Sequence, residues 1–148
     1  MTIVVYRDGV IASDSAIHLG NTRLGSVRKI ARGPDGSLGG AAGDANSLAK
    51  FVDWIRDGER EPFGQLGGDL YPDALIVRPS GALFYTGHLG TPYRVTGVPW
   101  LLVGCGATVA LGALHMGATA KEAVKAAIRW DSGCAGDIQI LTLGKPKR

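Results

Sequence analysis

The stretch Thr2-Ile-Val-Val-Tyr-Arg-Asp-Gly-Val-Ile-Ala-Ser-Asp14 decides how the chain begins to fold. Its first half is β-branched and aromatic, which favours an extended strand. Asp8-Gly9 is a strong hairpin signal, because a two-residue turn needs positive φ angles that these residues tolerate. Residues 10–14 then form the returning strand. The chain is therefore predicted to open with an antiparallel hairpin that starts at Thr2.

Strand and turn signals continue beyond this hairpin. Strands are predicted at residues 27–32 and 37–42, joined by Gly33-Pro-Asp-Gly36, so that the first forty residues form an antiparallel meander. Later strands are predicted at residues 74–77, 82–86, 93–95, 100–103 and 138–143.

Helical patterns separate these strands. Residues 45–57 repeat apolar side chains at helical spacing, and Gly58 is predicted to end that helix. Within it, Phe51 and Trp54 are expected on opposite sides, so that one of them faces outward. Residues 107–116 are almost all small or apolar, which favours a helix buried between layers.

A third helix begins at Thr119-Ala-Lys-Glu122, which is a capping box. The order of strands, helix, strands, two helices and a strand predicts an α+β fold, with two antiparallel sheets sandwiched between helical layers. One domain is expected to span residues 1–148, since no linker or repeat divides the chain.

The composition excludes several classes of function. Charged residues make up 20% of the chain and hydrophobic ones 45%, and the net charge of +3 forms no aromatic–basic stripe for nucleic acid. No apolar run is long enough to cross a membrane and no signal peptide is apparent, so a cytoplasmic protein is expected. Cys105 and Cys134 lie at no metal-ligand spacing, which favours free buried thiols and no metal or cofactor.

Thr2 can act as a nucleophile if Met1 is removed. Methionine aminopeptidase removes the first methionine when a small residue follows it. A terminal threonine combines a hydroxyl nucleophile with a free α-amine, of pKa about 8, that can accept its proton. Threonine is also simply a good strand former, and that structural reading is stronger for Thr2 taken alone.

Further motifs follow Thr2 in a fixed order. They are Ala12-Ser-Asp-Ser15, Leu19-Gly-Asn-Thr22, Gly25-Ser-Val-Arg-Lys-Ile30, Ala41-Ala-Gly43, Val103-Gly-Cys-Gly106 and Asp131-Ser-Gly-Cys-Ala-Gly-Asp137. This ordered set resembles HslV, the bacterial relative of proteasome β-subunits, over nearly the whole chain. The resemblance implies a four-layer αββα sandwich, the N-terminal-nucleophile (Ntn) hydrolase fold, and a threonine-type endopeptidase.

The resemblance implies a role for three residues around Thr2. Lys29 would lower the pKa of the Thr2 hydroxyl and amine, and Asp14 would keep the lysine charged and in place. The backbone N–H of Gly43 would stabilise the oxyanion of the reaction.

Two further site residues follow from the same comparison. Asp131 matches an acidic residue that steadies the terminal amine. Cys105 stands where the family has a serine that hydrogen-bonds near that amine, and a thiol is a weaker donor and acceptor. Cys134 replaces a second serine and is interpreted as a small buried hydrophobe.

The resemblance also implies a pocket for the substrate side chain before the scissile bond. Its small or apolar lining predicts a preference for large hydrophobic residues. The implied lining residues are Val27, Ala31, Ala41 and Ala45.

Partners and rival functions stay open at this level. The family implies a peptide or unfolded-protein substrate, an AAA+ unfoldase as a candidate partner, and a homo-oligomer of about six or more subunits in a ring, stacked rings or a spiral. Residues 59–72 hold too many Gly and Pro residues for the second helix that HslV-type chains carry there. The alternatives are a catalytically silent assembly homologue and an Ntn amidase acting on a small molecule.

Overall fold

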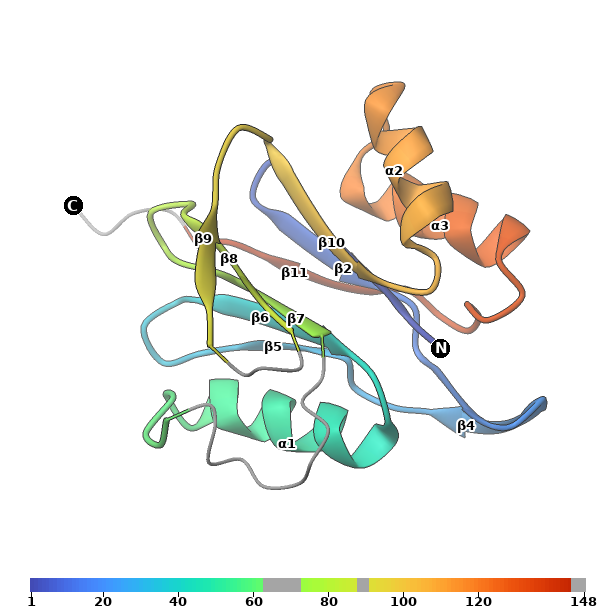
Figure 1. Ribbon diagram of the computed structural model, residues 1–148, viewed down its shortest axis with the longest axis horizontal. Helices are drawn as coiled ribbons and strands as arrows, with labels where there is room; N and C mark the ends of the chain where they lie inside the picture. The colour runs from blue at the N-terminus through green and yellow to red at the C-terminus, as the bar shows by residue number, and fades with distance from the viewer. Residues whose placement is uncertain (63–72, 88–90, 145–148) are drawn as a thin grey trace.

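Four layers make up the computed structural model, which describes residues 1–62, 73–87 and 91–144. The helix α1 (Ala45–Arg56) covers one sheet, and α2 (Ala107–His115) with α3 (Ala120–Trp130) covers the other, while the two sheets pack face to face (Figure 1). The predicted α+β sandwich of two antiparallel sheets between helical layers is confirmed.

The two sheets hold nine of the described strands. The first contains β1 (Ile3–Arg7), β2 (Val10–Ser13), β10 (Trp100–Gly104) and β11 (Gln139–Thr142), in the order β10-β1-β2-β11. The second contains β5 (Ile30–Arg32), β6 (Leu38–Ala42), β7 (Asp73–Val77), β8 (Leu83–Thr86) and β9 (Tyr93–Val95), paired in chain order. A separate hairpin is formed by β3 (Ala16–Leu19) and β4 (Thr22–Ser26).

Local signals in the sequence specify the turns and helix ends. Asp8 and Gly9 both have positive φ angles, of 50° and 81°, so the first hairpin closes with the predicted two-residue turn. The Thr119 hydroxyl accepts the Glu122 N–H at 3.1 Å, and the Glu122 carboxylate accepts the Thr119 N–H at 3.0 Å. Both groups would otherwise lack a partner at the helix start, which is why the capping box forms.

The predicted meander of the first forty residues is wrong. After β2 the chain leaves the first sheet, forms the β3–β4 hairpin and enters the second sheet at β5. The strand predicted at residues 27–32 begins only at Ile30, because the backbone N–H of Lys29 donates to the side chain of Gln139 at 3.0 Å. The Gly20-Asn21 dipeptide, where Gly20 adopts a φ of 58°, is a turn signal that indicates the β3–β4 hairpin.

Two predictions about helix burial are also wrong. Both Phe51 and Trp54 are buried, with ring centroids 5.8 Å apart, because residues three apart lie on the same side of a helix. The α2 helix is not buried all round: it belongs to an outer layer, and Leu111 remains 46% exposed.

The space between the sheets holds a continuous apolar core. Its largest members include Val4, Ile11, Ile30, Leu38 and Leu75, all with no exposed surface. Burying each such side chain contributes about 1.5–3 kcal/mol, which favours the closed sandwich. Among the described helices, none is long and apolar enough to cross a membrane. Most of the segment predicted to lack a second helix, residues 63–72, lies outside the described residues.

Candidate active site

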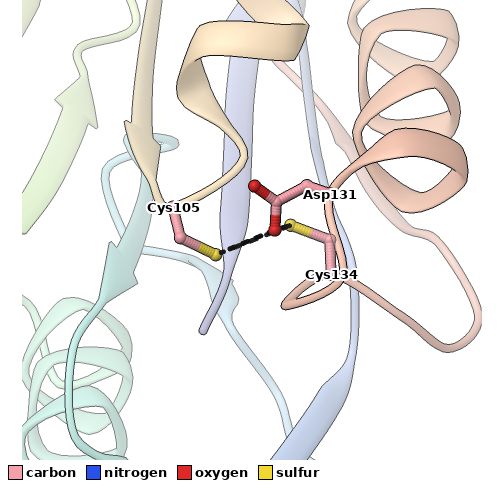
Figure 2. A group of neighbouring side chains, drawn as sticks. All are labelled: Cys105, Asp131 and Cys134. Atoms are coloured by element: carbon pink, nitrogen blue, oxygen red, sulfur yellow. Dashed lines mark hydrogen bonds between the residues drawn. The ribbon is translucent and has the colours of Figure 1, made fainter.

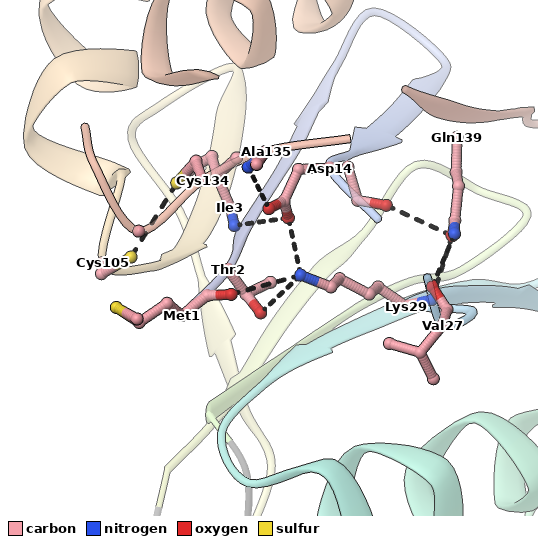
Figure 3. A network of polar contacts seen from close by, with 12 residues as sticks. Met1, Thr2, Ile3, Asp14, Val27, Lys29, Cys105, Cys134, Ala135 and Gln139 are labelled. Atoms are coloured by element: carbon pink, nitrogen blue, oxygen red, sulfur yellow. Dashed lines mark hydrogen bonds and ion pairs between the residues drawn. The ribbon is translucent and has the colours of Figure 1, made fainter. Parts of the chain in front are cut away.

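A buried ammonium group lies beside Thr2, at the start of β1. Lys29 Nζ donates to Thr2 Oγ1 at 3.0 Å and to Asp14 Oδ1 at 2.9 Å, as Figure 3 shows. The side chains of Lys29 and Asp14 are 1% and 0% exposed. Lys29 therefore contacts both Thr2 and Asp14 in the folded chain, and the three residues that the family resemblance grouped lie together.

The Asp14 carboxylate is fully satisfied in this position. Oδ1 accepts the backbone N–H of Ile3 at 3.1 Å in addition to the Lys29 ammonium, and Oδ2 accepts the backbone N–H of Ala135 at 3.0 Å. A buried carboxylate with fewer partners would be strongly unfavourable. Asp14 thus joins the beginning of β1, the segment before β11 and Lys29 through one side chain.

Gln139 positions Lys29 and was not singled out in the sequence. Its amide nitrogen donates to the carbonyl of Val27 at 2.7 Å, and its amide oxygen accepts the backbone N–H of Lys29 at 3.0 Å (Figure 3). Ser13 Oγ donates to the same oxygen at 3.4 Å. Gln139 therefore holds residues 27–29 against the opposite sheet. No local pattern marks a glutamine on a closing strand for this role.

Gly104 allows β10 to approach the backbone of Thr2 closely. A Cβ atom at this position would lie 2.0 Å from the Thr2 carbonyl oxygen, and the φ of Gly104 is 113°. Both facts restrict the position to glycine. The backbone on either side of Thr2 is therefore held by Gly104 and by Ile3, whose N–H is bonded to Asp14.

Met1 occupies the position in front of Thr2. Lys29 Nζ also donates to the Met1 carbonyl oxygen at 3.2 Å, so its three N–H groups all have acceptors. While the Met1–Thr2 peptide bond is intact, the nitrogen of Thr2 is an amide and cannot act as a base. Met1 itself is 53% exposed.

Cys105, Asp131 and Cys134 gather close to the N-terminus, as Figure 2 shows. Both cysteines are free, Cys134 being buried and Cys105 exposed, so the expectation that both thiols are buried is wrong for Cys105. Burial raises the pKa of the Cys134 thiol, and the neighbouring Cys105 and Asp14 add to the effect. The sequence spacing gave no sign that these two cysteines would meet.

A pocket of about 230 Å³ opens at Thr2 and Lys29. Val27 and Ala45 line it as expected. Gly43, which was expected as the oxyanion donor, also lines it and has a φ of 148°, which favours glycine. Ala31 and Ala41 do not line it: both are buried in the apolar cluster beneath α1. The remaining lining residues were not predicted, and they are Met1, Ala16, Ile17, His18, Asp44 and Leu48.

The pocket walls come from β3, from the segment that follows β4 and from the start of α1. Asp44 caps that helix by accepting the N–H groups of Asn46 and Ser47 at 3.0 and 3.1 Å. His18 has a buried Nδ1 atom without a hydrogen-bond partner in the described part of the chain. The pocket is thus apolar at Val27 and Leu48 and polar at its Asp44 and His18 side.

Solved structures share this architecture. BPH of Thiobacillus denitrificans, alone and in complex with epoxomicin, superposes with a TM-score of 0.71 at 22% sequence identity, covering 97% of this chain and 98% of that one. No family model and no curated protein matches the sequence. The likeness therefore concerns the fold.

Proposed function

We propose that this chain is a threonine-type endopeptidase, resembling HslV and proteasome β-subunits, in which Thr2 becomes the N-terminal nucleophile once Met1 is removed. The observation that carries the proposal is the buried Lys29 ammonium, which donates to Thr2 Oγ1 at 3.0 Å while Asp14 balances its charge. A cation buried at a hydroxyl has no evident structural benefit, because burying an ion pair seldom stabilises a fold.

The shared fold supports the proposal from an independent direction. BPH of Thiobacillus denitrificans was solved in complex with epoxomicin, a proteasome inhibitor. A protein of the same architecture therefore accepts a ligand directed at proteasome sites. We infer that the Thr2 pocket of this chain accepts peptide-like ligands as well.

The first half of the proposed reaction forms an ester at Thr2. The free α-amine takes the hydroxyl proton as Thr2 Oγ1 attacks the substrate carbonyl, and the Lys29 ammonium stabilises the developing alkoxide charge. The Gly43 N–H is assigned to the oxyanion of the tetrahedral intermediate. Collapse of that intermediate breaks the peptide bond, and the protonated α-amine returns its proton to the leaving amine.

The second half hydrolyses that ester. A water molecule gives its proton to the α-amine and adds to the acyl carbonyl. The new intermediate then collapses, releasing the carboxylic acid and restoring the Thr2 hydroxyl. Asp131 and Cys105 are assigned to holding the amine during both halves, with Cys105 the weaker partner because a thiol forms weak hydrogen bonds.

We also propose that the subunit works in a homo-oligomer of about six or more copies, as a ring, stacked rings or a spiral. Exposed apolar side chains on the α2–α3 layer support this: Leu111 is 46%, Met116 83% and Trp130 72% exposed. Side chains of this kind concentrated on one layer are typical of interfaces. An enclosed site would confine hydrolysis to peptides and unfolded chains that enter, and an AAA+ unfoldase remains a candidate partner.

The mass of the intact chain, measured with and without a peptide epoxyketone, tests the assignment. Loss of the Met1 residue mass followed by addition of one inhibitor at Thr2 is the expected result. A fully processed chain that remains unmodified would contradict the peptidase and favour the silent homologue. Adduct formation without hydrolysis of any peptide in a panel would instead favour an amidase.

A further inference from the structure

A second cluster of reactive side chains lies next to the proposed catalytic residues. Cys105 follows β10, Asp131 caps the end of α3, and Cys134 lies in the turn after it (Figure 2). Cys105 Sγ lies 3.8 Å from Cys134 Sγ, and the Asp131 Oδ1 atom is 3.5 Å from the first sulfur and 3.8 Å from the second. Two sulfurs and one carboxylate oxygen therefore face a common point.

The spacing of these three atoms matches a tetrahedral zinc site. With Zn–S bonds of about 2.3 Å and a Zn–O bond of about 2.1 Å, tetrahedral angles separate the two sulfurs by about 3.8 Å and sulfur from oxygen by about 3.6 Å. The observed separations of 3.8, 3.5 and 3.8 Å differ from these by about 0.2 Å at most. An ion could enter one face of the cluster without moving the backbone.

The surroundings of the cluster fit a bound cation. The Gly133 N–H donates to Asp131 Oδ1 at 2.8 Å, which fixes the carboxylate as outer hydrogen bonds do in metal sites. Cys134 is 3% exposed while Cys105 is exposed, so the cluster has one anchored side and one open side. Two sulfur ligands favour zinc over magnesium or calcium.

The cluster reaches the N-terminus at Gly133. A Cβ atom there would lie 2.9 Å from Cys105 Sγ and 2.9 Å from both Cβ and Sδ of Met1. Met1 and Cys105 are thus neighbours of the same glycine. The cluster therefore lies close to where the chain begins.

We propose that Cys105, Asp131 and Cys134 bind a zinc ion beside the N-terminal residue, and that the bound ion suppresses hydrolysis by Thr2. Both thiols would release their protons to solvent on binding. The ion would engage Asp131 and Cys105, the groups assigned to the α-amine, and would withdraw them from that role. The suppression rests on the proposed function, whereas the binding site does not.

Cobalt titration of the reduced, full-length chain tests the site directly. One equivalent of Co²⁺ should produce thiolate-to-cobalt charge-transfer absorption and the visible bands of a tetrahedral ion, and Zn²⁺ should abolish both. Cys134→Ser and Cys105→Ser should each weaken zinc binding, measured by competition with a chromophoric chelator, by more than about 100-fold, since even outer-sphere changes cost 10–100-fold. His115→Ala removes an exposed histidine at the end of α2 and is the matched control, with unchanged affinity expected.

Different results would contradict the zinc site and the suppression of hydrolysis. No charge-transfer band in the parent chain, or a band of undiminished intensity at one equivalent of Co²⁺ in Cys134→Ser, would overturn the site. Cys134→Ala and thermal melting of each variant show whether the chain still folds. Peptide hydrolysis with and without one equivalent of zinc tests the suppression separately: equal rates would overturn it and leave the site standing. A metal-free chain that hydrolyses no peptide would contradict the proposed function, while the cobalt spectrum would still decide the site.

Discussion

The ammonium nitrogen of Lys29 lies 3.0 Å from the hydroxyl oxygen of Thr2, and the two residues are 1% and 2% exposed. They are 27 positions apart in the sequence, and they precede strands of opposite sheets. The ammonium is therefore held where negative charge would develop on the Thr2 oxygen, and both groups are almost entirely buried. Electrostatic stabilisation is strongest in such surroundings.

Replacing Thr2 by alanine is expected to reduce the hydrolysis of fluorogenic peptides to the background rate, because the nucleophilic oxygen is lost. Thr2→Ser keeps a hydroxyl and is the matched control, with measurable hydrolysis and the same processing of Met1. Thermal melting should show that both variants remain folded. Undiminished hydrolysis by Thr2→Ala would exclude Thr2 as the nucleophile.

Lys29→Ala is expected to abolish hydrolysis and also to lower the free energy of unfolding by about 3–5 kcal/mol. The stability loss follows because the buried Asp14 carboxylate is left without its cation. Urea denaturation measures the stability, and hydrolysis per folded molecule measures the chemistry. Lys29→Arg retains the charge but cannot reproduce the contacts of a compact ammonium with Thr2 and Asp14, so it should also be inactive. Normal activity in Lys29→Arg would show that charge alone is sufficient.

Gln139→Met is expected to lower the turnover number more than it raises KM. Methionine has a similar length but cannot bond the backbone of Val27 and Lys29, so two peptide groups lose their partner, at about 1–3 kcal/mol each if they stay unsatisfied. Gln139→Glu keeps the acceptor for Lys29 and loses the donor to Val27, and should have an intermediate effect. Equal activity of the parent and both variants would show that Gln139 has no positioning role.

Cleavage is expected to favour substrates with Leu or Tyr before the scissile bond over those with Arg or Glu. The pocket supports this through the apolar side chains of Val27, Ala45 and Leu48. Ala45→Phe should narrow the pocket and shift the preference toward smaller residues, as measured by kcat/KM over a peptide series. Ala49→Phe makes the same change one helical turn later, outside the pocket lining, and should leave the preference unchanged. A parent enzyme that prefers Arg or Glu would contradict the pocket assignment.

Light scattering coupled to size exclusion is expected to show a homo-oligomer of about six or more subunits. Leu111→Asp introduces a charge on the exposed part of α2 and should shift the chain toward smaller species. Leu111→Met preserves an apolar surface and should assemble like the parent. A monodisperse monomer of the parent chain at micromolar concentration would be the contrary result.

Features governed by short stretches of sequence could be predicted, while those formed by distant residues could not. Asp8-Gly9 and the Thr119–Glu122 capping box act through neighbouring backbone groups, so the printed sequence was sufficient for both. Thr2, Asp14 and Lys29 could be placed together only through resemblance to a family, since their contact depends on the packing of two sheets.

The remaining features had weak signals or none. The meeting of Cys105 and Cys134 joins segments on either side of two helices, and neither cysteine belongs to a metal-binding motif. Gln139 resembles any polar residue on a strand. Ala31 and Ala41 were expected in the pocket but face α1 instead, because a side chain's direction depends on where its strand begins.

Thr2 directly precedes β1 in one sheet, and Lys29 directly precedes β5 in the other. Neither sheet alone holds both the hydroxyl and the ammonium, so the reactive pair comes into existence only when the sandwich closes. A chain still emerging from the ribosome, or one misfolded in either sheet, would carry a threonine with no more reactivity than any other. Under the proposed function, completion of folding would therefore act as the first safeguard against unwanted hydrolysis, and assembly would provide a second.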